Sequence, residues 1–101
     1  MFPGEEKYSL VDQMRRSSRS VAGNIAEAWM KRYYVKSFIN KIIDSCGEAG
    51  ETEVWINIAR DAGYISDKQY DCLFVGYQEV NRMLNGMIEK ADRFCFKQTC
   101  L

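Results

Sequence analysis

Histidine is absent from this sequence of 101 residues, and proline occurs only once, at Pro3. Without histidine, the commonest general base for a serine or cysteine nucleophile is missing, as is the imidazole ligand of many zinc sites. None of the four cysteines forms a Cys-x-x-Cys pair, and no glycine-rich phosphate-binding loop occurs. These absences disfavour an enzyme, and we expect no cofactor, no metal and no small-molecule substrate.

Long apolar runs are also missing. No stretch approaches the roughly 18 apolar residues that a membrane-spanning helix needs, and no basic-then-apolar leader of the secretory type opens the chain. We therefore expect a cytoplasmic protein without a membrane partner.

Three helices are predicted from apolar residues that recur every three or four positions, at about residues 9–29, 35–62 and 66–95. Ser9 is the predicted N-cap of the first helix. Gly63 should end the second in a left-handed turn, and Ser66 with Gln69 should form the capping box of the third. Because the connections are short, neighbouring helices should be antiparallel. The predicted fold is all-α, an antiparallel up-down helical bundle in a single domain of residues 1–101.

The second helix is apolar on two faces. One face carries Val35, Ile39, Ile42, Cys46, Ala49 and Ile56, and the other carries Phe38, Ile43, Val54, Trp55, Ile58 and Ala59. Such a helix is central to a bundle or lies at a subunit interface. Gly47 and Gly50 are predicted sites of close helix approach, and Cys46 and Cys72 are expected as buried free thiols. The third helix has a heptad-like stripe that predicts coiled-coil-like packing: Tyr70, Leu73, Tyr77, Val80, Leu84, Met87, Ala91 and Phe94.

The formal net charge is zero, but the charges are unevenly distributed. Basic residues dominate from Gln13 to Ile43: Arg15, Arg16, Arg19, Lys31, Arg32, Lys36 and Lys41. Acidic residues dominate from Asp44 to Glu79. The basic residues can form a phosphate-binding face, or they can neutralise an acidic neighbouring helix. Tyr33 and Tyr34 can stack on bases or serve as packing residues where two helices connect.

Glu53 falls within the apolar stripe of the second helix that contains Ile42 and Ile56. A carboxylate in such a stripe needs a partner, so we predict that Glu53 is buried and paired with an arginine of the first helix. Glu51 and Glu53 are two positions apart on a helix and point to different faces, which argues against a catalytic carboxylate pair.

Several ordered motifs connect the chain with a known family. They are Phe2-Pro3, Glu6-Lys7-Tyr8, Leu10, Gln13-Met14-Arg15-Arg16-Ser17, Ser20-Val21, Asn24-Ile25-Ala26-Glu27, Glu51-Thr52-Glu53-Val54-Trp55-Ile56, Ala59, Gly63-Tyr64-Ile65 and Arg82-Met83-Leu84-Asn85-Gly86. In these motifs the chain resembles the bacterial 23S rRNA intervening-sequence proteins, also called the four-helix-bundle family. The resemblance extends from about Phe2 to Ala91.

This resemblance implies an antiparallel four-helix bundle that assembles as a homopentamer and has no catalytic activity. Members are encoded in insertions of 23S rRNA genes or stand alone on bacterial chromosomes. A related branch, the accessory variability determinant of diversity-generating retroelements, binds nucleic acid and a reverse transcriptase. The chain departs from the family in starting at the Phe-Pro motif, which another amphipathic helix usually precedes. It also has Ala28 at the end of the Asn-Ile-Ala-Glu motif, and it is neutral where the retroelement branch is strongly basic.

Two functions therefore remain open. One is a non-enzymatic, oligomeric bundle that binds RNA, DNA or a nucleoprotein through Arg15, Arg16, Arg19, Lys31, Arg32, Lys36 and Lys41. The other is a structural or protein-interaction module without nucleic-acid binding, or an accessory subunit of a reverse transcriptase. In both, the second apolar face of residues 35–62 favours a homo-oligomer joined through the second and third helices, since monomers rarely expose a large apolar patch. The resemblance favours five subunits.

Overall fold

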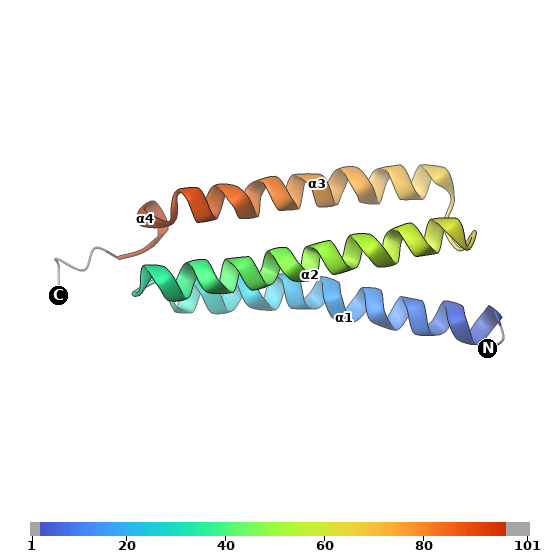
Figure 1. The fold of residues 1–101 in the computed structure, drawn as a ribbon, viewed down its shortest axis with the longest axis horizontal. Coiled ribbons are helices and arrows are strands. Elements are labelled where there is room, and N and C mark those ends of the chain that lie inside the picture. The colour runs from blue at the N-terminus through green and yellow to red at the C-terminus, as the bar shows by residue number, and fades with distance from the viewer. Residues whose placement is uncertain (1–2, 97–101) are drawn as a thin grey trace.

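The computed structural model describes residues 3–96 and consists of helices joined by short turns (Figure 1). The helices are α1 (Pro3–Met30), α2 (Val35–Asp61), α3 (Asp67–Glu89) and the single turn α4 (Ala91–Phe94). No strand occurs within residues 3–96. In the same part of the chain, no helix is both long and apolar enough to cross a membrane. The predicted all-α, antiparallel helical bundle is confirmed.

Two helix boundaries differ from the prediction. Helix α1 begins at Pro3, so Ser9 lies inside the helix and the prediction of an N-cap at Ser9 was wrong. The early start is consistent with local chemistry, because proline is tolerated in a first turn and Glu5 and Glu6 complement the helix dipole there. The third predicted helix is broken at Lys90, whose φ of −109° and ψ of 27° separate α3 from α4.

The predicted signals between α2 and α3 are confirmed. Gly63 has a φ of +77°, and its N–H donates to the Arg60 carbonyl at 2.9 Å. The N–H of Tyr64 donates to the Ala59 carbonyl at 2.9 Å, completing the two-bond C-terminal motif that a left-handed residue permits. Ser66 and Gln69 then form the reciprocal capping box that begins α3.

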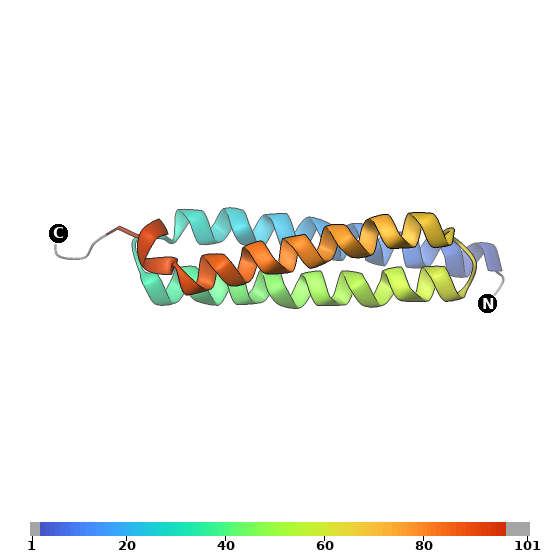
Figure 2. The ribbon, with the colours of Figure 1, turned by 90° about the horizontal axis from the view of Figure 1, so that it is seen from above.

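The three long helices form an elongated rod with extents of 58 × 24 × 12 Å (Figures 1 and 2). Helix α2 packs against both α1 and α3. In the described part of the chain, no Cα atom of α1 lies within 8 Å of one in α3. Side chains from α1 and α3 instead line an apolar groove between the two helices, which includes Met14, Ala22, Ile25, Leu73, Tyr77 and Met83.

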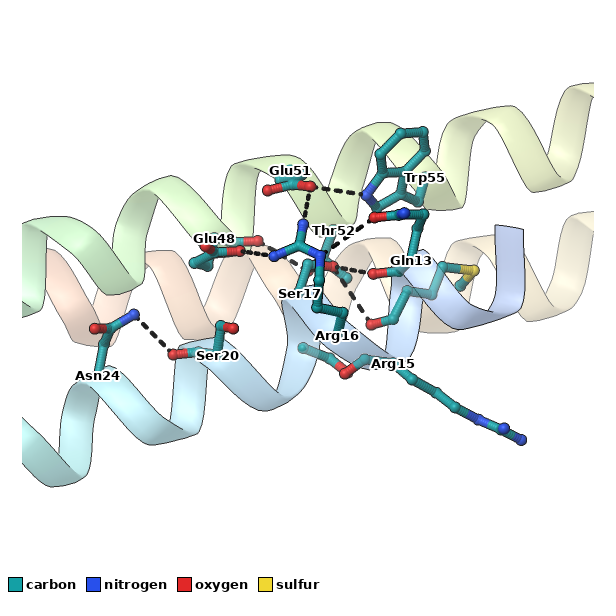
Figure 3. Close-up of polar contacts among 12 residues, drawn as sticks. Gln13, Arg15, Arg16, Ser17, Ser20, Asn24, Glu48, Glu51, Thr52 and Trp55 are labelled. Carbon is teal, nitrogen blue, oxygen red and sulfur yellow. Dashed lines mark hydrogen bonds and ion pairs between the residues drawn. The ribbon is translucent and has the colours of Figure 1, made fainter. Parts of the chain in front are cut away.

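Small polar residues form the seam between α1 and α2. Ser17, Ser45 and Thr52 are almost completely buried. The Ser45 hydroxyl donates to the Val21 carbonyl across the seam at 2.9 Å. Thr52 Oγ1 lies 2.7 Å from Ser17 Oγ and 2.8 Å from the Glu48 carbonyl, so it bridges the helices while remaining satisfied on its own helix (Figure 3). Their small size lets the backbones approach, and their hydrogen bonds remove most of the cost of burying hydroxyls.

The core continues along the inner face of α2 and is closed at one end by α4. Phe38, Ile42 and Leu84 are buried in one cluster together with Ala28 and Ala91. The rings of Phe38 and Phe94 stack with centroids 6.0 Å apart. Because α4 turns back after Lys90, it places Ala91 and Cys95 over the end of this core.

Other packing predictions need correction. A Cβ added at Gly47 or Gly50 would meet nothing within 4 Å, so no helix of the described chain approaches these positions closely. Cys72 is exposed, because it lies on the outer side of α3. Of the predicted α3 stripe only Leu84 and Ala91 are buried, since the same stripe also borders the open groove toward α1.

The seam gives a test of the fold. Ser45→Leu should lower the free energy of unfolding by about 1–3 kcal/mol, because a larger side chain forces the backbones apart and removes the bond to the Val21 carbonyl. The matched control is Asn40→Leu on the exposed side of α2, which should change stability little. Urea unfolding measures both, and equal stability of the two variants would contradict the seam.

Candidate nucleic-acid interface

The arginines of α1 do not form one surface. The Arg16 side chain reaches α2, where its guanidinium pairs with Glu51 and lies 3.5 Å from Glu48. Its Nε–H also donates to Gln13 at 3.2 Å. Figure 3 shows Arg15 extending in another direction, away from these acids. All three arginines are exposed, but only Arg16 links α1 to α2 through ion pairs within the described residues.

The pairing of Arg16 with Glu51 shifts the pKa values of both groups. The Arg16 guanidinium donates to Glu51 and lowers the pKa of that carboxyl below its usual value, while Glu51 raises the pKa of Arg16. The Trp55 indole N–H donates to the same Glu51 oxygen at 3.3 Å. The partners are solvent-accessible, so their attraction is screened by salt.

Lys41 is likewise held by acids. Its ammonium lies 2.9 Å from Glu27 on α1 and 3.8 Å from Asp44 one turn along α2. This pairing lowers the pKa of Glu27 and raises the pKa of Lys41. Two of the seven predicted phosphate-binding residues, Arg16 and Lys41, are therefore neutralised within the chain.

The prediction for Glu53 was wrong in both parts. Glu53 is half-buried, and it accepts a hydrogen bond of 2.6 Å from the amide nitrogen of Asn81 on α3. The arginine of α1 that reaches α2, Arg16, pairs with Glu51 instead. As predicted, Glu51 and Glu53 lie on different faces of α2, but the face that carries Glu53 meets α3.

A second group of basic residues gathers where the α1–α2 connection meets α4. We define this basic end as residues 29–36 together with 89–96, which lie at the same end of the rod (Figure 1). It contains the predicted Lys31, Arg32 and Lys36. It also contains Lys90 and Arg93, which the sequence analysis missed. The acids there are Glu89 and Asp92.

The five bases of this end form no ion pair with the described part of the chain. None of them lies within 4.0 Å of a carboxylate oxygen in the described residues. Arg15 and Arg19 are also unpaired by this criterion, but Arg19 is twelve residues before Lys31, or about 18 Å along the helix. The predicted basic residues thus fall into two separate groups rather than one.

Arg32 organises the aromatic residues of the basic end. Its guanidinium donates to the Trp29 carbonyl at 2.8 Å and lies over the Trp29 ring, 4.1 Å from the centroid. The same guanidinium is 4.8 Å from the centroid of Phe96, whose backbone N–H donates to the Arg32 carbonyl at 3.1 Å. Phe96 in turn contacts Tyr33, with centroids 4.6 Å apart. We call these four side chains the aromatic ladder.

The opposite end of the rod has the other sign of charge. Residues 3–8 and 61–71 carry the acids Glu5, Glu6, Asp61, Asp67 and Asp71 against Lys7 and Lys68. The neutral chain is therefore polarised along its length, with excess positive charge at the basic end. A local potential of this kind acts on a charged partner even when net charge is zero.

Within residues 3–96, no group of three or more histidine, cysteine, aspartate or glutamate side chains is placed to hold a metal ion. The site and the fold together define a class: a small helical-bundle protein with charged and aromatic surfaces and no recognisable catalytic constellation among its described residues.

Comparison with known proteins gives the family. The family model described as 23S rRNA-intervening sequence protein matches residues 1–86. The chain belongs to this family, which confirms the resemblance found in the sequence. A crystal structure of a protein of unknown function from the S23 ribosomal protein family of Bacteroides thetaiotaomicron is similar, with 33% identity and a TM-score of 0.73. The similarity covers 78% of this chain and 72% of that one. No curated protein matches the chain.

The Arg16 contacts predict how stability responds to acid. The folded pKa of Glu51 is lowered, so its contribution to stability is present above the ordinary glutamate value of 4.5 and is lost as pH falls through the folded pKa. Glu51→Gln should therefore lose less thermal stability than the parent between neutral pH and pH below 4.5. Melting temperatures across this range measure the difference, which high salt should reduce. Parallel pH profiles for parent and variant would contradict this role of Glu51.

Proposed function

We propose that this chain is a non-enzymatic bundle protein that binds nucleic acid through its basic end. The observation that carries the proposal is the convergence of five bases at one end of the rod: Lys31, Arg32, Lys36, Lys90 and Arg93. None of them has an ion-pair partner within residues 3–96. Lysine and arginine contacts with phosphates supply most of the affinity in non-specific binding to nucleic acid. Unpaired bases are the ones available for such contacts, since a base already paired within the chain must first give up its acid.

The ion pairs of the bundle remove two of the seven basic residues predicted from the sequence from the proposed binding site. Arg16 and Lys41 are assigned to structural pairs with the acids of the bundle. Arg15 and Arg19 lie on α1 about 18 Å or more from Lys31, so they form a separate group and are not part of the basic end. The charge asymmetry along the sequence is thus divided between neutralising α2 and supplying the basic end.

A charge-reversal experiment tests the proposal. Lys31→Glu combined with Lys36→Glu should weaken binding to a short hairpin RNA at least about tenfold, since phosphate contacts are replaced by repulsion. Loss of two phosphate contacts should also reduce the slope of log affinity against log salt by about 1.4–1.8, the range between single-stranded and duplex nucleic acid. Fluorescence anisotropy of labelled RNA measures both quantities.

The matched control is Lys7→Glu with Lys68→Glu at the opposite end, which changes net charge by the same amount. This control should retain most of the parent affinity if the basic end is the site. Equal losses for the two double variants would mean that net charge alone governs binding, and absence of binding by the parent would refute the proposal.

Self-association is a second candidate role, and the open apolar surfaces of the bundle favour it. On the outer side of α2, Ile43 and Val54 are 51% and 52% exposed. On α3, Val75 and Met83 are 62% and 55% exposed. Together with the groove between α1 and α3, these side chains offer the kind of apolar surface that homo-oligomers bury. We propose a homo-oligomer joined through α2 and α3, and the family resemblance favours a pentamer.

Light scattering at low micromolar concentration tests this second proposal. The parent should have a mass several times that of the monomer, and Val54→Lys should reduce it because a charge in an apolar interface is costly. Tyr8→Lys is the control, since Tyr8 is 70% exposed near the acidic end. A parent of monomer mass, with unfolding independent of concentration, would show that these surfaces need no second subunit.

A further inference from the structure

The aromatic ladder is more exposed than the closing of a helical core requires. Trp29, Tyr33 and Phe96 are 48%, 53% and 43% exposed, and the neighbouring Tyr34 is 63% exposed. The core beneath is already closed by other residues, because Ala28 and Phe38 are fully buried and Cys95 is 8% exposed. The ladder therefore lies on top of a finished core and keeps large parts of its rings open to solvent.

The ladder is also held in place. Arg32 lies close to two rings, over Trp29 and over Phe96, and its hydrogen bond to the Trp29 carbonyl fixes the guanidinium. The backbone bond from Phe96 to Arg32 joins α4 to the α1–α2 connection at the same point. A rigid aromatic surface loses little conformational entropy when a planar ligand stacks on it.

The charges around the ladder complement a phosphate backbone. Lys31 and Lys36 flank the tyrosines in sequence, and Arg93 lies in the α4 turn just before Phe96. Aromatic faces beside lysine and arginine are the combination that binds single strands, because unstacked bases lie on the rings while phosphates meet the cations. A duplex offers the same phosphates but keeps its bases paired and stacked within the helix.

We propose that the aromatic ladder, with Tyr34, binds unpaired nucleotides, whose bases stack on the open faces of Trp29, Tyr33 and Tyr34. This inference deepens the proposed function and rests on it: the basic end supplies the phosphate contacts, and the rings select single-stranded over double-stranded nucleic acid. The ligand class is single-stranded RNA or DNA, and stacking by itself does not distinguish the two sugars.

Tryptophan fluorescence gives a direct readout of stacking. The chain has two tryptophans, and Trp55→Phe leaves Trp29 as the single emitter. Titration with oligouridylate should quench Trp29, because a stacked base contacts the indole. Oligothymidylate in a parallel titration shows whether DNA binds as well as RNA. A duplex of equal phosphate number should bind more weakly and quench less.

Ring-removal variants supply the second arm. Tyr33→Ala and Tyr34→Ala should each weaken oligouridylate binding at least about fivefold, in line with the cost of losing one stacked base. Duplex affinity and the salt slope should stay near the parent values, since no cation is lost. Tyr33→Phe should retain affinity because its ring remains, and Tyr8→Ala is the control for removal of an exposed ring elsewhere.

The outcomes separate the two proposals. If single strands and duplexes bind equally well and the tyrosine variants lose nothing, the stacking inference is overturned while nucleic-acid binding by the basic end stands. If neither form binds, both are overturned. Melting curves identify any variant that fails to fold, and the quenching of Trp29, which needs no tyrosine substitution, then decides the result.

Discussion

The close approach of α1 and α2 is the constraint on which the rest of the bundle depends. It is possible because Ser17, Ser45 and Thr52 are small enough for the backbones to meet and because their hydroxyls find partners in the seam. Once these two helices are in register, Arg16 reaches Glu51 and Lys41 reaches Glu27. The seam also occupies one side of α2, so α3 packs on another side and the groove between α1 and α3 stays open.

Charge in this protein is better described by position than by total. Basic residues of the α1–α2 segment fall into two classes. Arg16 and Lys41 pair with neighbouring acids, whereas those at the basic end form no ion pair within residues 3–96. Acids at the opposite end make the zero net charge a separation of charge along a 58 Å rod. A charged partner close to one end responds to the charges of that end rather than to the net charge of the chain, because charges beyond the Debye length contribute little.

Family membership settles the fold but leaves the activity to be argued from the surface. The similar crystal structure belongs to a protein described as of unknown function, so it offers no activity to transfer. Helical bundles support many functions, and function resides in the side chains they present. Here the unusual side chains are those of the basic end, where an arginine is ordered by two rings and the nearby tyrosines are exposed.

The apolar surface of α2 and α3 concerns the proposed self-association rather than the binding of nucleic acid. Ile43 and Val54 are exposed beside Gly47 and Gly50, so the outer side of α2 is both apolar and accessible to another backbone. The sequence predicted close helix approach at these glycines from their small size alone, and no helix of the described chain lies there.

The sequence by itself determined the helical class, the turn at Gly63 and the capping box at Ser66, because these depend on residues close together in the chain. It could not determine which charges meet. Helical spacing fixes the direction of Glu51 relative to Glu53, but only the packed structure decides that α1 lies on the first side and α3 on the second. The basic end depended even more on tertiary structure. Lys90 and Arg93 join Lys31 and Lys36 there because the chain turns at Lys90 and folds α4 over the end of the core, a contact between segments almost sixty residues apart.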